Sequence, residues 1–197
     1  MVDLIKYKAQ ASRLIIGIIF FLGSVYLETK NFLLFHTLME LFCVFISFAM
    51  AAVALNTYRL SSEQFGSFLG LAYFFVGFFL LLHTITIPAL GVIPNSSVNM
   101  SIHFWLASRY MEGISILAAC RLLQNEKIYK TRIIKYLYPL ITGVLLTAIG
   151  YWNILPISYL EGYGFTDFKV LSDGVILILF GISFFLFIKE KKSIDRK

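Results

Sequence analysis

Long apolar runs constrain this chain more than any other feature, and several reach the length of about 17–25 residues that a helix needs to cross a bilayer. The expected spans are Leu14–Leu27, Phe32–Tyr58, Phe65–Ile87, Ser101–Leu123, Ile133–Trp152 and Gly174–Ile188. Only 14% of the residues are charged, whereas a soluble domain carries about 25%. We therefore expect an all-α integral membrane bundle of six transmembrane helices.

The basic residues fall mainly on one side of these six spans. Six spans place both termini on the same side, and 14 of the 17 Lys and Arg residues flank that side. Lys30 and Lys169 are expected on the other side, and Arg109 lies within the membrane. Because cytoplasmic loops carry an excess of Lys and Arg, we predict a multi-pass protein of the cell membrane with both termini in the cytoplasm. The same distribution accounts for the net charge of +6 without a nucleic-acid partner.

Two opposite charges lie inside the fourth expected span. Arg109 and Glu112 are three residues apart in the stretch HFWLASRYME, His103–Glu112, so they fall on neighbouring helix faces. A charge at that depth costs at least ~2.5 kcal/mol on insertion scales, so it normally faces the bundle interior and has a partner. Two interpretations stay open at this point. The residues form a buried pair that holds helices together, or they belong to a ligand or signalling site.

The three histidines of the chain all fall near the outer ends of expected spans. They are His36, His83 and His103. Glu40 lies one helical turn below His36, and Cys43 continues the same face. Imidazole and carboxylate suit copper, zinc or iron, and paired imidazoles can hold a haem iron. We therefore predict a ligand or metal site from the three histidines and Glu40, with Cys43 as a secondary candidate. The alternative is that the histidines are interfacial and simply hydrated.

The segment between the fifth and sixth spans is rich in polar residues, and we expect a loop there. Its charged residues are Glu161, Asp167, Lys169 and Asp173. Within it, the stretch GYGFTDFK at residues 162–169 looks too structured for a bare linker. Lys169 is expected either to reach back toward the polar cluster or to lie at the lipid headgroups.

Two further patterns concern packing. The third expected span carries Gly66, Gly70 and Gly77, a stripe of small residues that lets a neighbouring backbone come close. Trp105 and Trp152 lie near the outer edge of the membrane, as in an aromatic belt.

Four separated motifs then appear in a characteristic order. They are Phe35-His36 with Glu40, Gly70–Thr84 (GLAYFFVGFFLLLHT), Trp105 with Arg109-Tyr110 and Glu112, and Gly164-Phe165-Thr166 with Phe168-Lys169. Over about residues 14–188 the chain resembles the third type of the membrane-associated sensor domains, the MASE group. One position departs from the pattern. The family often has an acidic residue three positions before the histidine of its third helix, and here that position is Leu80.

The resemblance implies a bacterial or archaeal sensory input domain, not itself an enzyme, over residues 1–188. Residues 189–197 would be a cytoplasmic charged tail or the start of a linker. The implied partners are the lipid bilayer, a fused or separate effector of the kinase or cyclic-dinucleotide type, and a second copy in a homodimer. The ligand would be a small molecule, a metal or a cofactor such as haem, with Tyr110 and Lys169 as secondary site candidates. The alternative function is a haem- or metal-binding membrane redox protein or enzyme that uses the same histidines.

Overall fold

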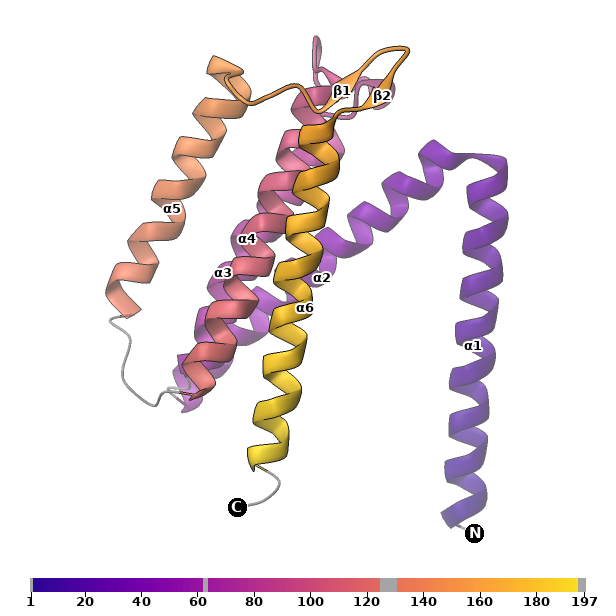
Figure 1. The fold of residues 1–197 in the computed structure, drawn as a ribbon. Helices are drawn as coiled ribbons and strands as arrows, with labels where there is room; N and C mark the ends of the chain where they lie inside the picture. The colour runs from indigo at the N-terminus through magenta and orange to yellow at the C-terminus, as the bar shows by residue number, and fades with distance from the viewer. Residues whose placement is uncertain (1, 62–63, 125–130, 195–197) are drawn as a thin grey trace. The chain divides into compact units, whose positions relative to one another are not determined.

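The computed structural model describes residues 2–61, 64–124 and 131–194, and most of these are helical (Figure 1). The chain forms two compact units, Met1–Leu41 and Phe42–Lys197, and each is described here by itself. Residues 125–130, between the fourth and fifth expected spans, and residues 195–197, at the end of the expected charged tail, lie outside the described residues.

Six α-helices account for most of the described residues. They are α1 (Val2–Lys30), α2 (Phe32–Ser61), α3 (Gln64–Ile85), α4 (Val98–Gln124), α5 (Thr131–Thr147) and α6 (Asp167–Ile194). The shorter elements are the 3-10 turn η1 (Pro88–Leu90), the π-helical turn η2 (Ala148–Trp152), and the strands β1 (Tyr159–Leu160) and β2 (Gly164–Phe165).

Four helices in the described part of the chain are long and apolar enough to cross a membrane. The candidate spans are Gln10–Lys30, Phe32–Thr57, Gly66–Ile85 and Asp167–Lys189. Helix α4 has 27 residues but carries charged and polar side chains, and the apolar helix Tyr136–Trp152 is shorter than a full span. The expected all-α membrane bundle is therefore confirmed, whereas the count of six spans stays a prediction.

In the first unit, a single residue separates α1 from α2. The Oδ1 atom of Asn31 accepts a hydrogen bond of 3.0 Å from the backbone N–H of Leu34, which is the N-cap interaction that begins a helix. The expected spans Leu14–Leu27 and Phe32–Tyr58 left a short loop at Glu28–Lys30 between them, and this prediction is wrong because α1 continues to Lys30. The cap on Asn31 makes a longer loop unnecessary.

The helices of the second unit alternate in direction. Helices α2 and α3 are antiparallel, since Gly77 faces Ser47 while Gly70 faces Ala54. Helices α3 and α4 are also antiparallel. The hydroxyl of Ser108 donates to the carbonyl of Val76 across that contact, at 3.2 Å. The glycine stripe therefore acts as expected at Gly70 and Gly77, where the neighbouring helix comes close enough to fill the space of a Cβ atom.

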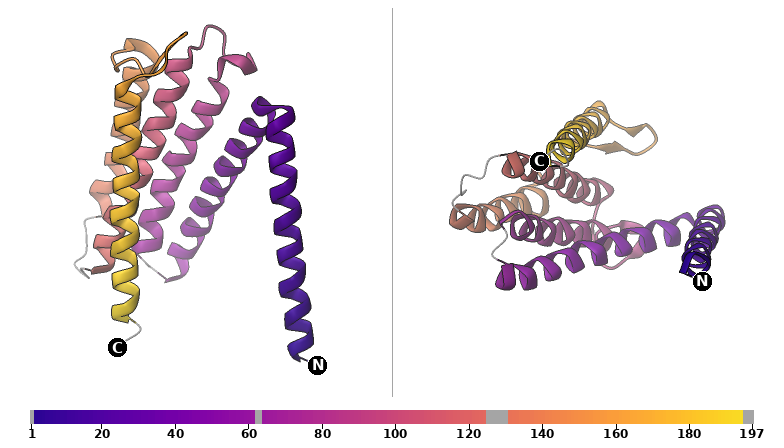
Figure 2. Two further views of the ribbon diagram at one scale, coloured as in Figure 1. Left: turned by 45° about the vertical axis from the view of Figure 1, so that its right-hand side comes forward. Right: turned by 90° about the horizontal axis from the view of Figure 1, so that it is seen from below.

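Helix α4 lies at the centre of this unit, with α3, α5 and α6 around it (Figures 1 and 2). It runs antiparallel to α5, because Ser115 meets Tyr138 while Met100 meets Gly150. It runs parallel to α6, where Cys120 contacts the carbonyl of Ser183. Helix α4 therefore has a neighbouring helix on several of its sides, and most of its polar residues are buried or half-buried.

The segment that precedes α6 is an ordered cap. Strands β1 and β2 pair antiparallel, with Tyr159 opposite Phe165 and Leu160 opposite Gly164. The turn between them uses Gly162 at φ 81°, a backbone conformation that glycine adopts without a steric penalty. The prediction that residues 162–169 are structured is therefore confirmed.

Helix α6 begins at Asp167, well before the expected start at Gly174. The sequence had assigned Lys169 and Asp173 to a loop, and this prediction is wrong. These two charges lie one turn apart and bind each other, with Nζ–Oδ1 at 2.6 Å. In addition, Asp167 lies in the first turn, where a negative charge interacts favourably with the helix dipole. The charged residues therefore extend the helix instead of ending it.

Candidate functional site

The indole ring of Trp105, on α4, has two cations beside it. The Nζ atom of Lys169, from α6, lies 4.3 Å from the ring centroid. The Cζ atom of Arg109, one turn along α4, lies 5.7 Å from it. Both distances are within the range of about 6 Å over which a cation is attracted to an aromatic ring. Trp105 thus joins a charge of α6 to a charge of α4.

Each of these cations also has its own carboxylate. Lys169 binds both oxygens of Asp173, at 2.6 and 2.7 Å, and Lys169 itself is buried. Arg109 donates from Nη1 to Oε2 of Glu112 at 2.6 Å. The group is therefore balanced in charge, which reduces the cost of keeping ions away from water.

A third helix joins this group through Tyr73 of α3, whose hydroxyl donates to Oε1 of Glu112 at 3.1 Å. We call the whole set the Trp105 cluster. Its members are Tyr73, Trp105, Arg109, Glu112, Lys169 and Asp173. The cluster links α3, α4 and α6, so a displacement of α6 relative to α4 would stretch or break the cation–π contact between Lys169 and Trp105.

One donor of the cluster is not used within the described part of the chain. The Nε atom of Arg109 is buried and has no hydrogen-bond partner there. Leaving a buried donor unsatisfied costs about 1–3 kcal/mol, so such a group normally meets a water molecule or a ligand. The Nε–H group of Arg109 can therefore donate a hydrogen bond to an acceptor from outside the described chain.

His83 fixes the end of α3 to the start of α4. Its Nδ1 lies 2.8 Å from the carbonyl oxygen of Ser101, and the hydroxyl of Ser101 donates back to the carbonyl of His83 at 3.1 Å. A carbonyl can only accept, so Nδ1 of His83 donates in this bond. A metal-binding histidine is commonly oriented by this kind of bond to a carbonyl.

His103 is held in a similar way by a different partner. Its Nε2 donates to the carbonyl of Pro156 at 3.0 Å, in the segment between η2 and β1. Its Nδ1 is buried and has no hydrogen-bond partner in the described part of the chain. His103 therefore ties α4 to the cap and keeps one lone pair that could accept a proton or bind a metal.

His36 and Glu40 lie one turn apart on α2 in the first unit. The ring of His36 stacks on Phe32 with 5.8 Å between the centroids. Cys43 follows in the second unit and is exposed. Because His83 and His103 belong to the second unit, the four-residue site of His36, Glu40, His83 and His103 stays a prediction.

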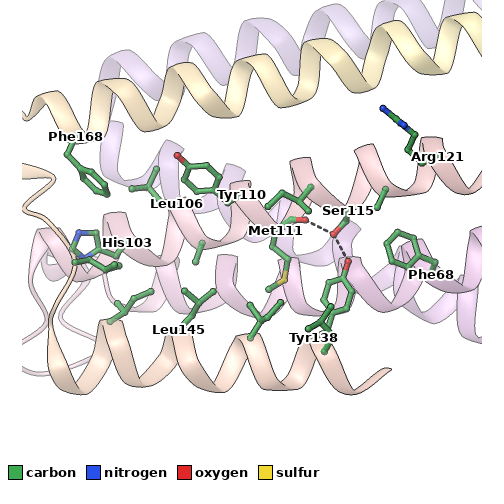
Figure 3. A pocket seen from close by; sticks show the side chains of 17 residues that line it. Phe68, His103, Leu106, Tyr110, Met111, Ser115, Arg121, Tyr138, Leu145 and Phe168 are labelled. Atoms are coloured by element: carbon green, nitrogen blue, oxygen red, sulfur yellow. Dashed lines mark hydrogen bonds between the residues drawn. The ribbon is translucent and has the colours of Figure 1, made fainter. Parts of the chain in front are cut away.

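A large apolar groove runs along α4, with a volume of about 750 Å³. It is lined by residues of α4 and α5, with smaller contributions from α3, η2 and α6. Figure 3 shows His103 and Phe168 at one end of it and Arg121 at the other. Midway, the hydroxyls of Ser115 and Tyr138 share a hydrogen bond of 2.6 Å. We call this the α4–α5 groove.

A comparison with known families now decides what kind of protein this is. The model of the family MASE3, described as a membrane-associated sensor domain, matches residues 27–197. The chain belongs to this family. The resemblance seen in the sequence is thus confirmed, and MASE3 is a family of sensory domains rather than of enzymes. No curated protein and no solved structure matches the chain.

In this MASE3 domain, the later motifs of the resemblance meet in space. Trp105, Arg109 and Glu112 come from one of them and Lys169 from another, and all four lie in the Trp105 cluster. Tyr110, which neighbours Arg109 in sequence, lines the groove, and its hydroxyl donates to the carbonyl of Ser172 on α6 at 3.4 Å.

Sequence reasoning missed several residues of this MASE3 domain. Tyr73 lies within the motif Gly70–Thr84 but was not singled out. Asn99 was also missed. Its Oδ1 accepts the backbone N–H groups of Ser158 and Tyr159, both at 2.8 Å, and so fixes the cap to α4. Asn99 lies in the first turn of α4, before the expected start of the span at Ser101, and the sequence did not show what it would bind.

Proposed function

We propose that this MASE3 domain is a six-span sensory input domain whose output leaves through α6 to a cytoplasmic effector. The observation that carries the proposal is the Trp105 cluster. A cation–π contact between Lys169 and Trp105 joins α6 to α4, and the hydrogen bond from Tyr73 to Glu112 joins α4 to α3. An intramembrane ionisable residue is by default a candidate functional group. Here ionisable residues of α4 meet those of α6, the helix that leads to the carboxyl terminus.

Two observations support the six-span topology. Helices α2 to α6 alternate in direction, so α4 and α5 run beside helices that are themselves long and apolar enough to span. In addition, 14 of the 17 basic residues fall on the side of the termini when six spans are counted. By the positive-inside rule both termini are cytoplasmic.

The mechanism would be a shift between two arrangements of α6 relative to α4. A ligand shifts such an equilibrium only by its difference in affinity for the two arrangements. The buried Nε–H group of Arg109 could donate a hydrogen bond to an acceptor atom of the ligand. The ligand would then lie next to the contacts that hold α6. Helix α6 carries these contacts near its start and is 28 residues long, which is about 40 Å at 1.5 Å per residue.

The partners follow from the family. A sensory domain of this kind acts on a kinase or a cyclic-dinucleotide module, fused or separate, and commonly as a homodimer. Residues after Ile188 then form the beginning of the connection to that effector.

A second candidate function is a metal or haem site built from His36, Glu40, His83 and His103. It is favoured by the orientation of His83 and His103, since each donates one ring N–H to a backbone carbonyl, as metal-binding histidines commonly do. Within a sensor such a site would detect a metal or a gas. In a redox protein the same residues would carry electrons.

The test of the sensory role is a fusion in which a diguanylate cyclase module follows Lys197. Trp105→Leu and Lys169→Met each remove the cation–π contact between α4 and α6, so each should change the cyclase output several-fold. Glu161→Gln removes an exposed charge of the turn between β1 and β2 that lies outside the cluster, and it should leave the output unchanged. Wild-type output from both cluster variants, with normal amounts of folded protein in the membrane, would contradict the proposal.

A further inference from the structure

The α4–α5 groove has walls that suit a hydrocarbon chain. Its lining is almost entirely apolar, and its volume of about 750 Å³ is within the range of about 300–1,000 Å³ found for small-molecule sites. Ile114 and Ile141 line it and are exposed. The groove is therefore open sideways, toward the position that lipid occupies around a membrane helix.

The length of the groove matches the apolar layer of a membrane. Its lining residues on α4 run from His103 to Arg121, a distance of about 27 Å at 1.5 Å per residue. The hydrocarbon core of a bilayer is about 30 Å thick. A long apolar chain that entered the groove would therefore remain at its normal depth.

A single basic side chain marks one end of the groove. Arg121 lines that end, is exposed, and has no ion pair or hydrogen bond within the described part of the chain. It follows Cys120, which contacts Ser183 in the second half of α6. With the carboxyl terminus in the cytoplasm, Arg121 lies at the cytoplasmic surface, where anionic headgroups attract basic residues.

We propose that the α4–α5 groove binds one acyl chain of an anionic phospholipid of the cytoplasmic leaflet, with its headgroup phosphate at Arg121. The apolar walls provide the hydrophobic contact, and the guanidinium matches a phosphate with two parallel hydrogen bonds. A neutral lipid would occupy the same groove but would leave Arg121 without an anionic partner. The charge at the end of the groove therefore selects the headgroup.

This binding goes beyond the sensory role, but it rests on the topology proposed above, which puts Arg121 at the cytoplasmic surface. The occupant would contact α5 along one wall, through residues such as Leu145, and Phe168 of α6 at the outer end (Figure 3). The lipid would thus become part of the packing between α5 and the helix that we propose carries the signal.

The experiment compares the lipids that the full chain keeps after reconstitution. The protein is placed in nanodiscs of equal parts phosphatidylglycerol and phosphatidylcholine, released into mild detergent, and examined by native mass spectrometry. Wild type should keep one phospholipid, with phosphatidylglycerol preferred. Arg121→Gln should reduce that preference about fivefold, which is the effect of one basic residue at a membrane surface.

Two further variants separate the groove from general surface charge. Lys189→Gln is the matched control, a basic residue of α6 that does not line the groove, and it should keep the full preference. Ala118→Trp fills the groove and should remove the retained lipid of both kinds. Ile141→Trp, on the exposed rim, serves if the first variant does not fold.

Three results would overturn the proposal. The first is an unchanged preference in Arg121→Gln, and the second is an equal loss in Lys189→Gln. The third is a retained molecule without phosphate, such as a free fatty acid or a neutral isoprenoid, in place of the phospholipid. The signalling fusion is not needed for any of these results, so the sensory role is tested separately.

Discussion

At the scale of single residues, aromatic and acidic partners together explain how two cations are kept away from water. Lys169 is buried, yet it touches both oxygens of Asp173 and the face of Trp105. Arg109 shares the same indole and binds Glu112. Cation–π contacts are worth about 2 kcal/mol or more when desolvated, so the ring is a substantial part of the environment of both charges.

The first prediction concerns the pair in α4. Breaking one side of a buried ion pair costs about 3–5 kcal/mol. The side chains of Arg109 and Glu112 are 21% and 13% exposed, so we expect Arg109→Ala to lose an amount near the lower end. The double variant with Glu112→Ala should lose less, because no unpaired carboxylate remains. Thermal unfolding in detergent measures both, and a single variant as stable as wild type would show that the pair contributes little.

The second prediction concerns the histidines. If His36, Glu40, His83 and His103 hold a metal or haem, the protein purified from its membrane should contain that group in stoichiometric amount. His36→Ala, Glu40→Ala or His83→Ala should each abolish it with folding near normal, since ligands act as a unit. Metal analysis and an absorption spectrum measure the bound metal or haem directly. Protein that is free of metal and colourless in every preparation would reject the site and leave the histidines as helix anchors.

Of the Trp105 cluster, the sequence could identify the pair of Arg109 and Glu112, but it missed Tyr73 and did not predict the contacts between helices. The depth of Arg109 in an apolar run and its spacing to Glu112 pointed to a pair within one helix. The contact between Trp105 and Lys169 joins residues far apart in the chain. No local pattern reports such a contact, so Trp105 could be read only as part of an aromatic belt.

At the scale of helices, small residues decide how closely α2 and α3 approach. A Cβ atom on Gly77 would lie 2.9 Å from the Cβ of Ser47, and a neighbour attached to the backbone cannot move away easily. Overpacking of this kind costs about 1–3 kcal/mol. The glycine stripe was visible in the sequence because its spacing is local, whereas the residues that it would face were not.

The third prediction follows from this contact. Gly77→Ala should lower the thermal stability of the protein in detergent. Gly143→Ala is the matched control, because a Cβ atom there meets nothing within 4 Å. In a helix interior alanine is favoured over glycine by about 0.5–1 kcal/mol, so the control should be neutral or slightly stabilising. Equal thermal stability of the two variants would contradict the close packing of α2 on α3.

Hydropathy predicted the positions of the helices well and their ends less well. The start of α6 was missed because Lys169 and Asp173 resemble loop residues when each is counted alone. In the helix they lie one turn apart and neutralise each other. Conversely, α4 was expected as a full span although its polar residues place it outside the four candidate spans among the described helices.

At the scale of the whole molecule, the fourth prediction is the topology. A reporter fused after Lys197 should be cytoplasmic, and one inserted within residues 95–99 should be external. The physical reason is the distribution of basic residues, 14 of 17 on the terminal side. Reporter activity and accessibility to membrane-impermeant reagents measure the two positions. An external carboxyl-terminal reporter would rule out the six-span arrangement.

The central claim is that α6 carries the output by changing its position relative to α4. Cys120 of α4 lies beside Ser183 of α6, with its Sγ 3.5 Å from the carbonyl oxygen. Ser183→Cys therefore offers a cross-link between the two helices, in a background that also carries Cys43→Ser. A fixed α6 cannot shift, so oxidation should lock the output of the cyclase fusion.

The decisive measurement is the output of this fusion in membrane vesicles, before oxidation, after cross-linking, and after reduction. We predict that the cross-link changes the output several-fold. In the cross-linked protein, Lys169→Met should no longer alter the output. A reductant should restore the original output and its sensitivity to Lys169→Met. The fusion with Ser183 intact should not respond to the oxidant. If the cross-link forms in full and the output remains that of the reduced protein, α6 does not signal by moving against α4, and the account is wrong.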